Sequence, residues 1–197
     1  MRIYDIRHTA TAVLAATVLL LAGAPTAAAQ QPTRVSDLSR ADRDRVMLEN
    51  RSRVMDADRL YREAVAHQDR GEWRKAAARY ERSARLRGGG DMKTPKLYRK
   101  AADAYFLAGK QGRAVTNFER AARSALDFGD VTLAADSYLK AALLSQERGD
   151  DIRANENGWK AQRLSGSTAL SDEVRRAIRQ HLKVGETAVA LGGGIPR

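Results

Sequence analysis

The sequence contains no cysteine among its 197 residues and has only four prolines and few aromatic residues. The lack of cysteine excludes disulfides, thiolate nucleophiles, zinc sites that use sulfur, and a lipid anchor on cysteine. Pro95 is the one proline between Pro32 and Pro196, so long helices are permitted through most of the chain. The folded part of this protein must therefore be held together by packing alone.

Motifs for catalysis or cofactor binding are also missing. No H-E-x-x-H, G-x-S-x-G, P-loop or dinucleotide fingerprint is present. His67 is expected to be a partly buried structural histidine, and His181 a solvated surface residue. The carboxylates are scattered singly among arginines, where pairing on exposed helix faces explains them. We therefore predict no enzyme activity, no catalytic residue, no cofactor and no metal.

The first 29 residues differ in composition from the rest of the chain. Arg2 and Arg7 precede an uncharged, alanine-rich stretch that ends in Ala27-Ala28-Ala29. A basic start, an apolar run and an A-x-A site are typical of an export signal. We expect a cleavable signal peptide over residues 1–29 and a periplasmic or extracellular protein. The alternative is a retained N-terminal membrane anchor, although this stretch would be a weak span.

Three segments of the chain repeat one spacing around Gly71, Gly109 and Gly149. Each has alanine seven residues before the glycine, then small residues at +5 and +12 and a larger one at +9 in the first two segments. Such regular self-similarity indicates stacked helical hairpins, in which small residues permit close helix crossings and large ones fill grooves. The repeated positions are Ala64, Ala76, Tyr80 and Ser83; Ala102, Ala114, Phe118 and Ala121; and Ala142, Ala154, Gly158 and Ala161.

The residue composition from Ser36 to Leu191 favours helix throughout. The first helix is expected from Ser36 or Leu38 to about Asp69, with a possible interruption near residues 50–52. Further helices are expected at about 73–86, 95–108, 111–126, 131–147 and 151–164, and a last one from about 171 to 191. The predicted organisation is a linker and N-terminal helix at 30–56, a repeat region at 57–164, a C-terminal capping helix at 165–191 and a disordered tail at 192–197.

This spacing resembles that of the tetratricopeptide repeat (TPR), which implies an all-α superhelix of helical hairpins with flanking helices. The glycines lie 38 and 40 residues apart, which is longer than the ~34 residues of that family. In the third segment Gly158 stands where an aromatic residue belongs, and Trp159 is expected to fill the gap. The repeat spacing also fits the third segment when Gly129 takes the place of Gly149. A more irregular α-solenoid or a plain antiparallel bundle therefore remain as alternatives.

The resemblance also implies a binding groove. In TPR domains the first helices of the repeats line the concave side and commonly hold a peptide or a partner helix. A carboxylate clamp of the family is not reproduced, because Tyr61 and Val65 stand at its positions. The first-helix residues expected to be free for a partner are Tyr61, Arg62, Val65, Lys96, Arg99, Lys100, Asp103, Leu139, Lys140 and Leu143.

Basic charge is the other distinctive property, with a formal net charge of +11. Seven cations and one acid lie between Arg82 and Lys100, which suggests either general solubility or a docking patch for an anionic partner. We predict an exported, non-enzymatic adaptor that binds a protein or peptide. The alternative is a basic helical protein that binds an anionic envelope polymer or lipid headgroups. Nucleic acid is not expected, because the aromatic residues are assigned to repeat packing.

Overall fold

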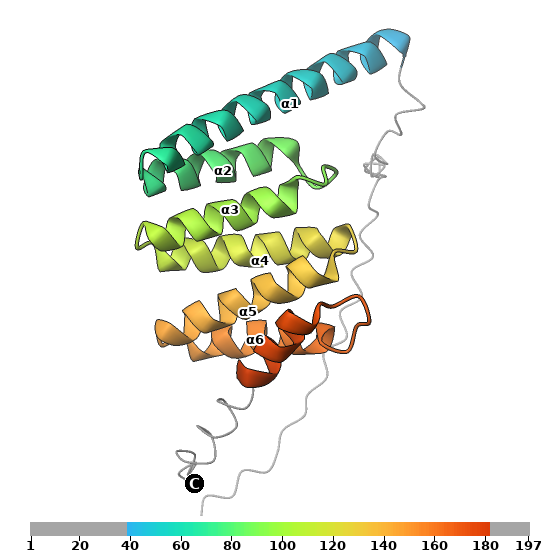
Figure 1. Ribbon diagram of the computed structural model, residues 1–197. Coiled ribbons are helices and arrows are strands. Elements are labelled where there is room, and N and C mark those ends of the chain that lie inside the picture. The colour runs from blue at the N-terminus through green and yellow to red at the C-terminus, as the bar shows by residue number, and fades with distance from the viewer. Residues whose placement is uncertain (1–38, 182–197) are drawn as a thin grey trace, which may run out of the picture.

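The computed structural model describes residues 39–181, in which six helices stack in chain order (Figure 1). The described chain contains no strand, and consecutive helices pack against each other. The predicted all-α, TPR-like arrangement of helical hairpins is therefore confirmed. The helices are α1 (Arg40–Asp69), α2 (Trp73–Arg87), α3 (Thr94–Leu107), α4 (Gln111–Asp127), α5 (Val131–Glu147) and α6 (Asp151–Leu164), followed by a helical segment over 172–181.

The start of α1 differs from the expectation. The helix begins at Arg40, because the Ser39 side chain accepts a hydrogen bond from the Asp42 N–H and caps its first turn. It continues without a break through residues 50–52, so the helix has no interruption there. Every residue from 39 to 56 is exposed, and burial begins at Ala57. The first half of α1 extends past the end of α2 (Figure 1).

Glycines in the left-handed backbone region end the helices at the turns. Gly71, Gly109, Gly129 and Gly149 have φ between 68° and 73°, which residues with a side chain rarely adopt. The residue after each glycine donates its N–H to a carbonyl five residues earlier, as Lys110 does to Tyr105 at 2.8 Å. The same turn occurs between α4 and α5 because Gly129 repeats the motif. Gly129 and Gly149, the two alternatives for the third segment, therefore both mark turns between helices.

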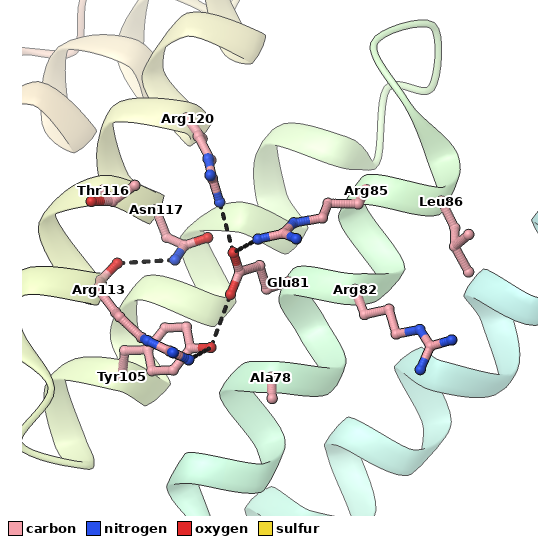
Figure 2. A pocket seen from close by; sticks show the side chains of 10 residues that line it. All are labelled: Ala78, Glu81, Arg82, Arg85, Leu86, Tyr105, Arg113, Thr116, Asn117 and Arg120. Carbon is pink, nitrogen blue, oxygen red and sulfur yellow. Dashed lines mark hydrogen bonds and ion pairs between the residues drawn. The ribbon is translucent and has the colours of Figure 1, made fainter.

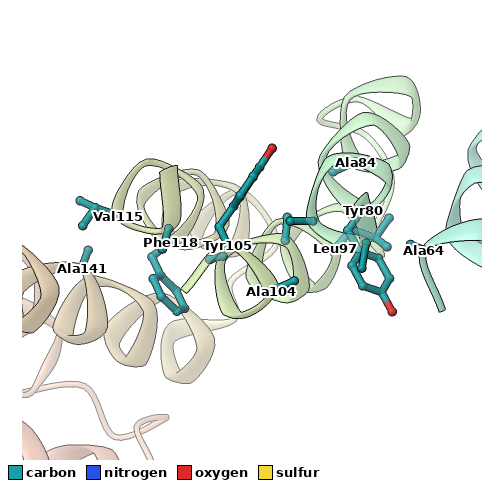
Figure 3. Packing of buried hydrophobic residues seen from close by; sticks show 14 of the residues in the cluster. Ala64, Tyr80, Ala84, Leu97, Ala104, Tyr105, Val115, Phe118 and Ala141 are labelled. Carbon is teal, nitrogen blue, oxygen red and sulfur yellow. The ribbon is translucent and has the colours of Figure 1, made fainter. Parts of the chain in front are cut away.

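The core of the stack consists of small residues at helix crossings and aromatic residues between them. Ala102 and Ala114 are fully buried where α3 packs against α4. Tyr80 and Phe118, from the second helices of two hairpins, point to one side of the layer, whereas Tyr105 points to the other (Figure 3). The first helices of the hairpins, α1, α3 and α5, form one row of the stack, and the second helices, α2, α4 and α6, form the other. Each aromatic ring fills the gap between two helices of the row opposite its own.

The third hairpin departs from the repeat where Gly158 replaces an aromatic residue. Trp159 does not fill the gap, because its side chain is 66% exposed, and that prediction is wrong. The last helical segment lies there instead: a Cβ at Gly158 would be 3.9 Å from His181 Nε2. His181 is half-buried, and this burial lowers its pKa. The expectation of a solvated surface histidine is therefore also wrong, since the helix that carries it docks on the stack.

Four predicted segments lie wholly or partly outside the described residues. They are the signal peptide at 1–29, residues 30–38 of the linker and N-terminal helix, residues 182–191 of the capping helix, and the tail at 192–197. Within the described part, Ile178 and Leu170 join Tyr138 and Ala161 in a buried cluster that closes the C-terminal end of the stack. No helix between residues 39 and 181 is long and apolar enough to cross a membrane.

Candidate functional site

The first pocket on the predicted groove lies between α1 and α3. It has a volume of about 320 Å³ and brings together Tyr61, Lys96 and Lys100 from the predicted set. Tyr61 packs partly against the core beside Tyr80, with ring centroids 5.8 Å apart, and leaves its other surface to the pocket. The lining is completed by Asp58, Arg87, Lys93 and Leu97.

Arg87 lies in the lining of this pocket with its side chain buried. Its side chain is only 3% exposed, and it forms ion pairs with Asp58 of α1 and with Asp91 of the loop before α3. Burial raises the pKa of Asp91, but hydrogen bonds from the Lys93 N–H and from Arg87 outweigh it and hold the pKa below its usual value. The arginine thus ties three consecutive elements together beside the pocket.

The two lysines of α3 present their charges to this pocket. Lys96 and Lys100 are exposed, and neither forms an ion pair with any residue between 39 and 181. Lys100 Nζ lies 5.6 Å from the centroid of the Tyr80 ring. A cation above an aromatic face is attracted by the ring while its outer side stays hydrated. Both cations can therefore meet an acidic partner.

A second pocket continues the groove between α3 and α5. Its volume is about 270 Å³, and it contains Asp103, Lys140 and Leu143 from the predicted set. Phe106 and Leu143 are 46% and 40% exposed, so the pocket offers an apolar surface. Burial raises the pKa of the Asp103 carboxyl, and Lys140 opposes this shift. This pocket is more apolar and less basic than the first. Its remaining lining residues are Phe118, Leu144 and Glu147.

An ion cluster joins α3 to α5 along the same groove. Arg99 forms an ion pair with Asp136 at 2.8 Å, and Lys140 approaches the same carboxylate at 3.6 Å. Arg99 is therefore half-buried and engaged within the stack. Of the predicted groove cations, it is the least able to meet a partner.

Three other predicted residues do not line either pocket. Leu139 is only 5% exposed, so its assignment to the groove is wrong. Leu139 occupies the same repeat position in α5 as Arg99 does in α3. The last helical segment covers this side of α5 through Ile178, in the way that α5 covers α3. Val65 packs partly against the core, and Arg62 is exposed outside both pockets. The α1/α3/α5 groove therefore consists of the two pockets and the ion cluster that accompanies them.

A larger cavity than either groove pocket lies between α2 and α4 (Figure 2). Its volume is about 740 Å³, and sequence analysis did not identify it. The run of cations from Arg82 to Lys100 is divided between the two sides: Arg82 and Arg85 line this cavity, whereas Lys96 and Lys100 line the groove. The signal that could have revealed it is Glu81, which occupies the same repeat position as Glu119 within a row of arginines.

None of the described residues form a group of His, Asp or Glu side chains suited to a metal ion. No family model matches the chain, and no curated protein matches it. The crystal structure of the Sgt2 TPR domain from Aspergillus fumigatus is similar, with 21% sequence identity and a TM-score of 0.46. The match covers 72% of this chain and 85% of that chain. The fold assignment therefore rests on the helix arrangement itself.

Proposed function

We propose that this chain is an exported, non-enzymatic adaptor that binds an extended segment of a partner protein in the α1/α3/α5 groove. The observation that carries the proposal is that two pockets lie on successive first helices, and each has exposed charged or apolar side chains in its lining. Helical repeat proteins commonly use such a continuous surface to hold a partner.

The chemistry of the two pockets defines the partner segment. Lys96 and Lys100 favour acidic residues at the α1/α3 end, where charge also speeds the encounter. Phe106 and Leu143 favour an apolar side chain at the α3/α5 end. A segment with acidic residues followed or preceded by a large apolar residue fits both.

Export remains part of the proposal because of the N-terminal sequence. The apolar, alanine-rich run ending in Ala27-Ala28-Ala29 supports signal cleavage after Ala29. N-terminal sequencing of the protein purified from its native host should find Gln30 at or near the first position. An intact Met1 in the membrane fraction would contradict export in soluble form.

The groove assignment is tested by selecting peptides from a displayed library against the wild-type protein and measuring their affinities. We expect acidic peptides with one large apolar residue, whose affinity falls in the Lys96→Glu/Lys100→Glu variant at low salt. Phe106→Ala should also weaken binding, because it removes apolar contact at the other pocket. Circular dichroism would verify that each variant remains helical.

The matched control is Lys110→Glu/Arg163→Glu, which changes the net charge equally at exposed positions outside the α1/α3/α5 groove. This variant should bind the selected peptides almost as well as the wild type. Equal loss of affinity in both double variants would mean that only the overall charge attracts the peptides. In that case the groove assignment is wrong.

A further inference from the structure

We propose that the cavity between α2 and α4 binds a soluble ligand with two or more adjacent phosphate groups, through Arg85, Arg113 and Arg120. This site lies on the other row of helices from the α1/α3/α5 groove. It is therefore a second function of the stack, independent of the partner segment proposed above.

Glu81 forms the centre of the cavity wall and organises the arginines (Figure 2). Its side chain is 12% exposed and accepts hydrogen bonds from Arg85, from Arg120 at 2.7 Å and from the Tyr105 hydroxyl at 2.9 Å. Burial raises the pKa of Glu81, but these hydrogen bonds outweigh it and hold the pKa below its usual value. Glu81 is therefore charged at neutral pH and keeps the guanidinium groups directed into the cavity.

Two of the arginines are also positioned by aromatic rings. Arg113 donates to the Tyr105 hydroxyl at 3.2 Å, and its Cζ lies 5.5 Å from the centroid of that ring. Arg120 Cζ lies 5.9 Å from the centroid of the Tyr98 ring. Stacking on an aromatic face holds the planar guanidinium in a fixed orientation. Both groups are therefore preorganised on the α4 side of the cavity.

The cavity has more donors than its one acid can satisfy. Each guanidinium has five N–H donors, whereas a carboxylate offers about four acceptor sites. Four arginines and a single carboxylate line the cavity. Arg82 lies on the edge towards α1, directed away from Glu81 in Figure 2. Most of the N–H groups are thus available to an incoming anion.

A second cavity in the same chain provides an internal comparison. Glu119, at the repeat position of Glu81, is bound by Arg153 at 2.7 and 2.8 Å and by Asn157 at 2.9 Å. This α4/α6 cavity is lined by three acids and three cations, which balance each other: Glu119, Asp150 and Glu156, with Arg123, Arg153 and Lys160. The equivalent cavity of the next hairpin thus has no excess of cations, so the fold does not require the excess between α2 and α4.

Phosphate fits this arrangement better than carboxylate. Arg85 approaches from α2, whereas Arg113 and Arg120 approach from α4. The oxygens of a tetrahedral phosphate diverge and can meet donors from both helices, whereas those of a carboxylate lie in one plane. A multivalent anion also offsets the repulsion from Glu81.

The test is a titration of the full-length protein with inorganic tripolyphosphate, measured by calorimetry at low salt. The cavity variant is Arg85→Gln/Arg113→Gln, which leaves Arg120 and Tyr105 on Glu81. The control is Arg123→Gln/Arg163→Gln, which removes the same charge from exposed positions outside the cavity. We expect the wild type and the control to bind tripolyphosphate with the same affinity. The affinity of the cavity variant should be lower by about tenfold or more, because charge-assisted hydrogen bonds are lost.

Three results would overturn the proposal. The first is an absence of tripolyphosphate binding to the wild type. The second is equal weakening in both double variants, which would mean that the overall charge alone attracts the anion. The third is tighter binding of hexaglutamate than of tripolyphosphate, which would assign the cavity to acidic peptides.

Discussion

Lys140 Nζ of α5 lies 5.7 Å from the centroid of the Phe118 ring in α4. Lys100 of α3 has the same relationship to Tyr80 of α2, at 5.6 Å. In each case the first helix of one hairpin covers the aromatic residue of the hairpin before it. The lysine stems therefore shield the core, while the ammonium groups line the α1/α3/α5 groove. Packing between hairpins and the charge of the groove thus depend on the same side chains.

The close crossing of α3 and α4 leaves no room for a larger residue at Ala102, which is fully buried. Ala102→Leu should lower the free energy of unfolding by about 1–3 kcal/mol, because it forces the two helices apart. Urea denaturation measures this change. Ala66→Leu is the matched control, since Ala66 is exposed on α1 and should tolerate the same substitution. If both variants unfold like the wild type, the assigned crossing is incorrect.

Phe118 is 3% exposed and fills the space between α3 and α5. Truncation to alanine should cost about 3–5 kcal/mol of stability, because the cavity cannot close fully. The midpoint of thermal unfolding should fall accordingly. Phe106→Ala removes the same ring from a position that is 46% exposed and should cost much less. Similar losses for the two variants would contradict the assignment of Phe118 to the core.

The repeated spacing predicted the helices well, because alanine at a crossing and glycine at a turn are local requirements. Five helices begin and end within about two residues of the expected positions. What the spacing could not predict was which element covers the last hairpin. Leu139 of α5 was expected in the groove, but it is buried in a cluster with Ile178 of the last segment. His181 of that segment was expected on the surface, but it lies beside Gly158 of α6.

The α2/α4 cavity was missed for a similar reason. Its arginines come from two helices that are separated in sequence by α3, and neither helix shows the cluster by itself. The run of cations from Arg82 to Lys100 is continuous in the chain but divided by the turn between α2 and α3. Contiguity along a chain is a poor guide to contiguity on a stack of hairpins.

Gly158 lies inside α6, where a Cβ would meet nothing closer than His181 Nε2 at 3.9 Å. Gly158→Ala should therefore stabilise the protein by about 0.5–1 kcal/mol, because alanine restricts the unfolded chain and favours helix. Gly109→Ala should have the opposite effect, since Gly109 has a φ of +68°. Chemical denaturation of the two variants distinguishes these cases. A destabilised Gly158→Ala variant would contradict the described space beside α6.

Glu72 links the end of α1 to the start of α2. A hydrogen bond with His67 at 2.5 Å and another from Lys75 lower the pKa of Glu72 from 4.5 to about 2. Because the folded-state pKa is lowered, the carboxylate stabilises the fold above pH 4.5, and this stabilisation is lost as the pH falls towards 2. Glu72→Gln should therefore be less stable than the wild type at pH 7, with the difference disappearing near pH 2.

The control for this prediction is Glu147→Gln. Glu147 is exposed at the end of α5 and forms no ion pair with another described residue. Its substitution should produce little change across the same pH range. A difference between Glu72→Gln and the wild type that stays constant from pH 7 to pH 2 would mean that the effect is not electrostatic.

Every extensive contact between helices in the described residues joins elements that are consecutive in the chain. No long loop has to close before the first contacts form, so the entropic barrier to folding is small and folding should be fast. Stability in such a chain is approximately a sum of each hairpin and its nearest neighbours. Amide hydrogens should therefore exchange first at the exposed half of α1 and last in the central hairpin, α3 and α4, which has another hairpin on each side.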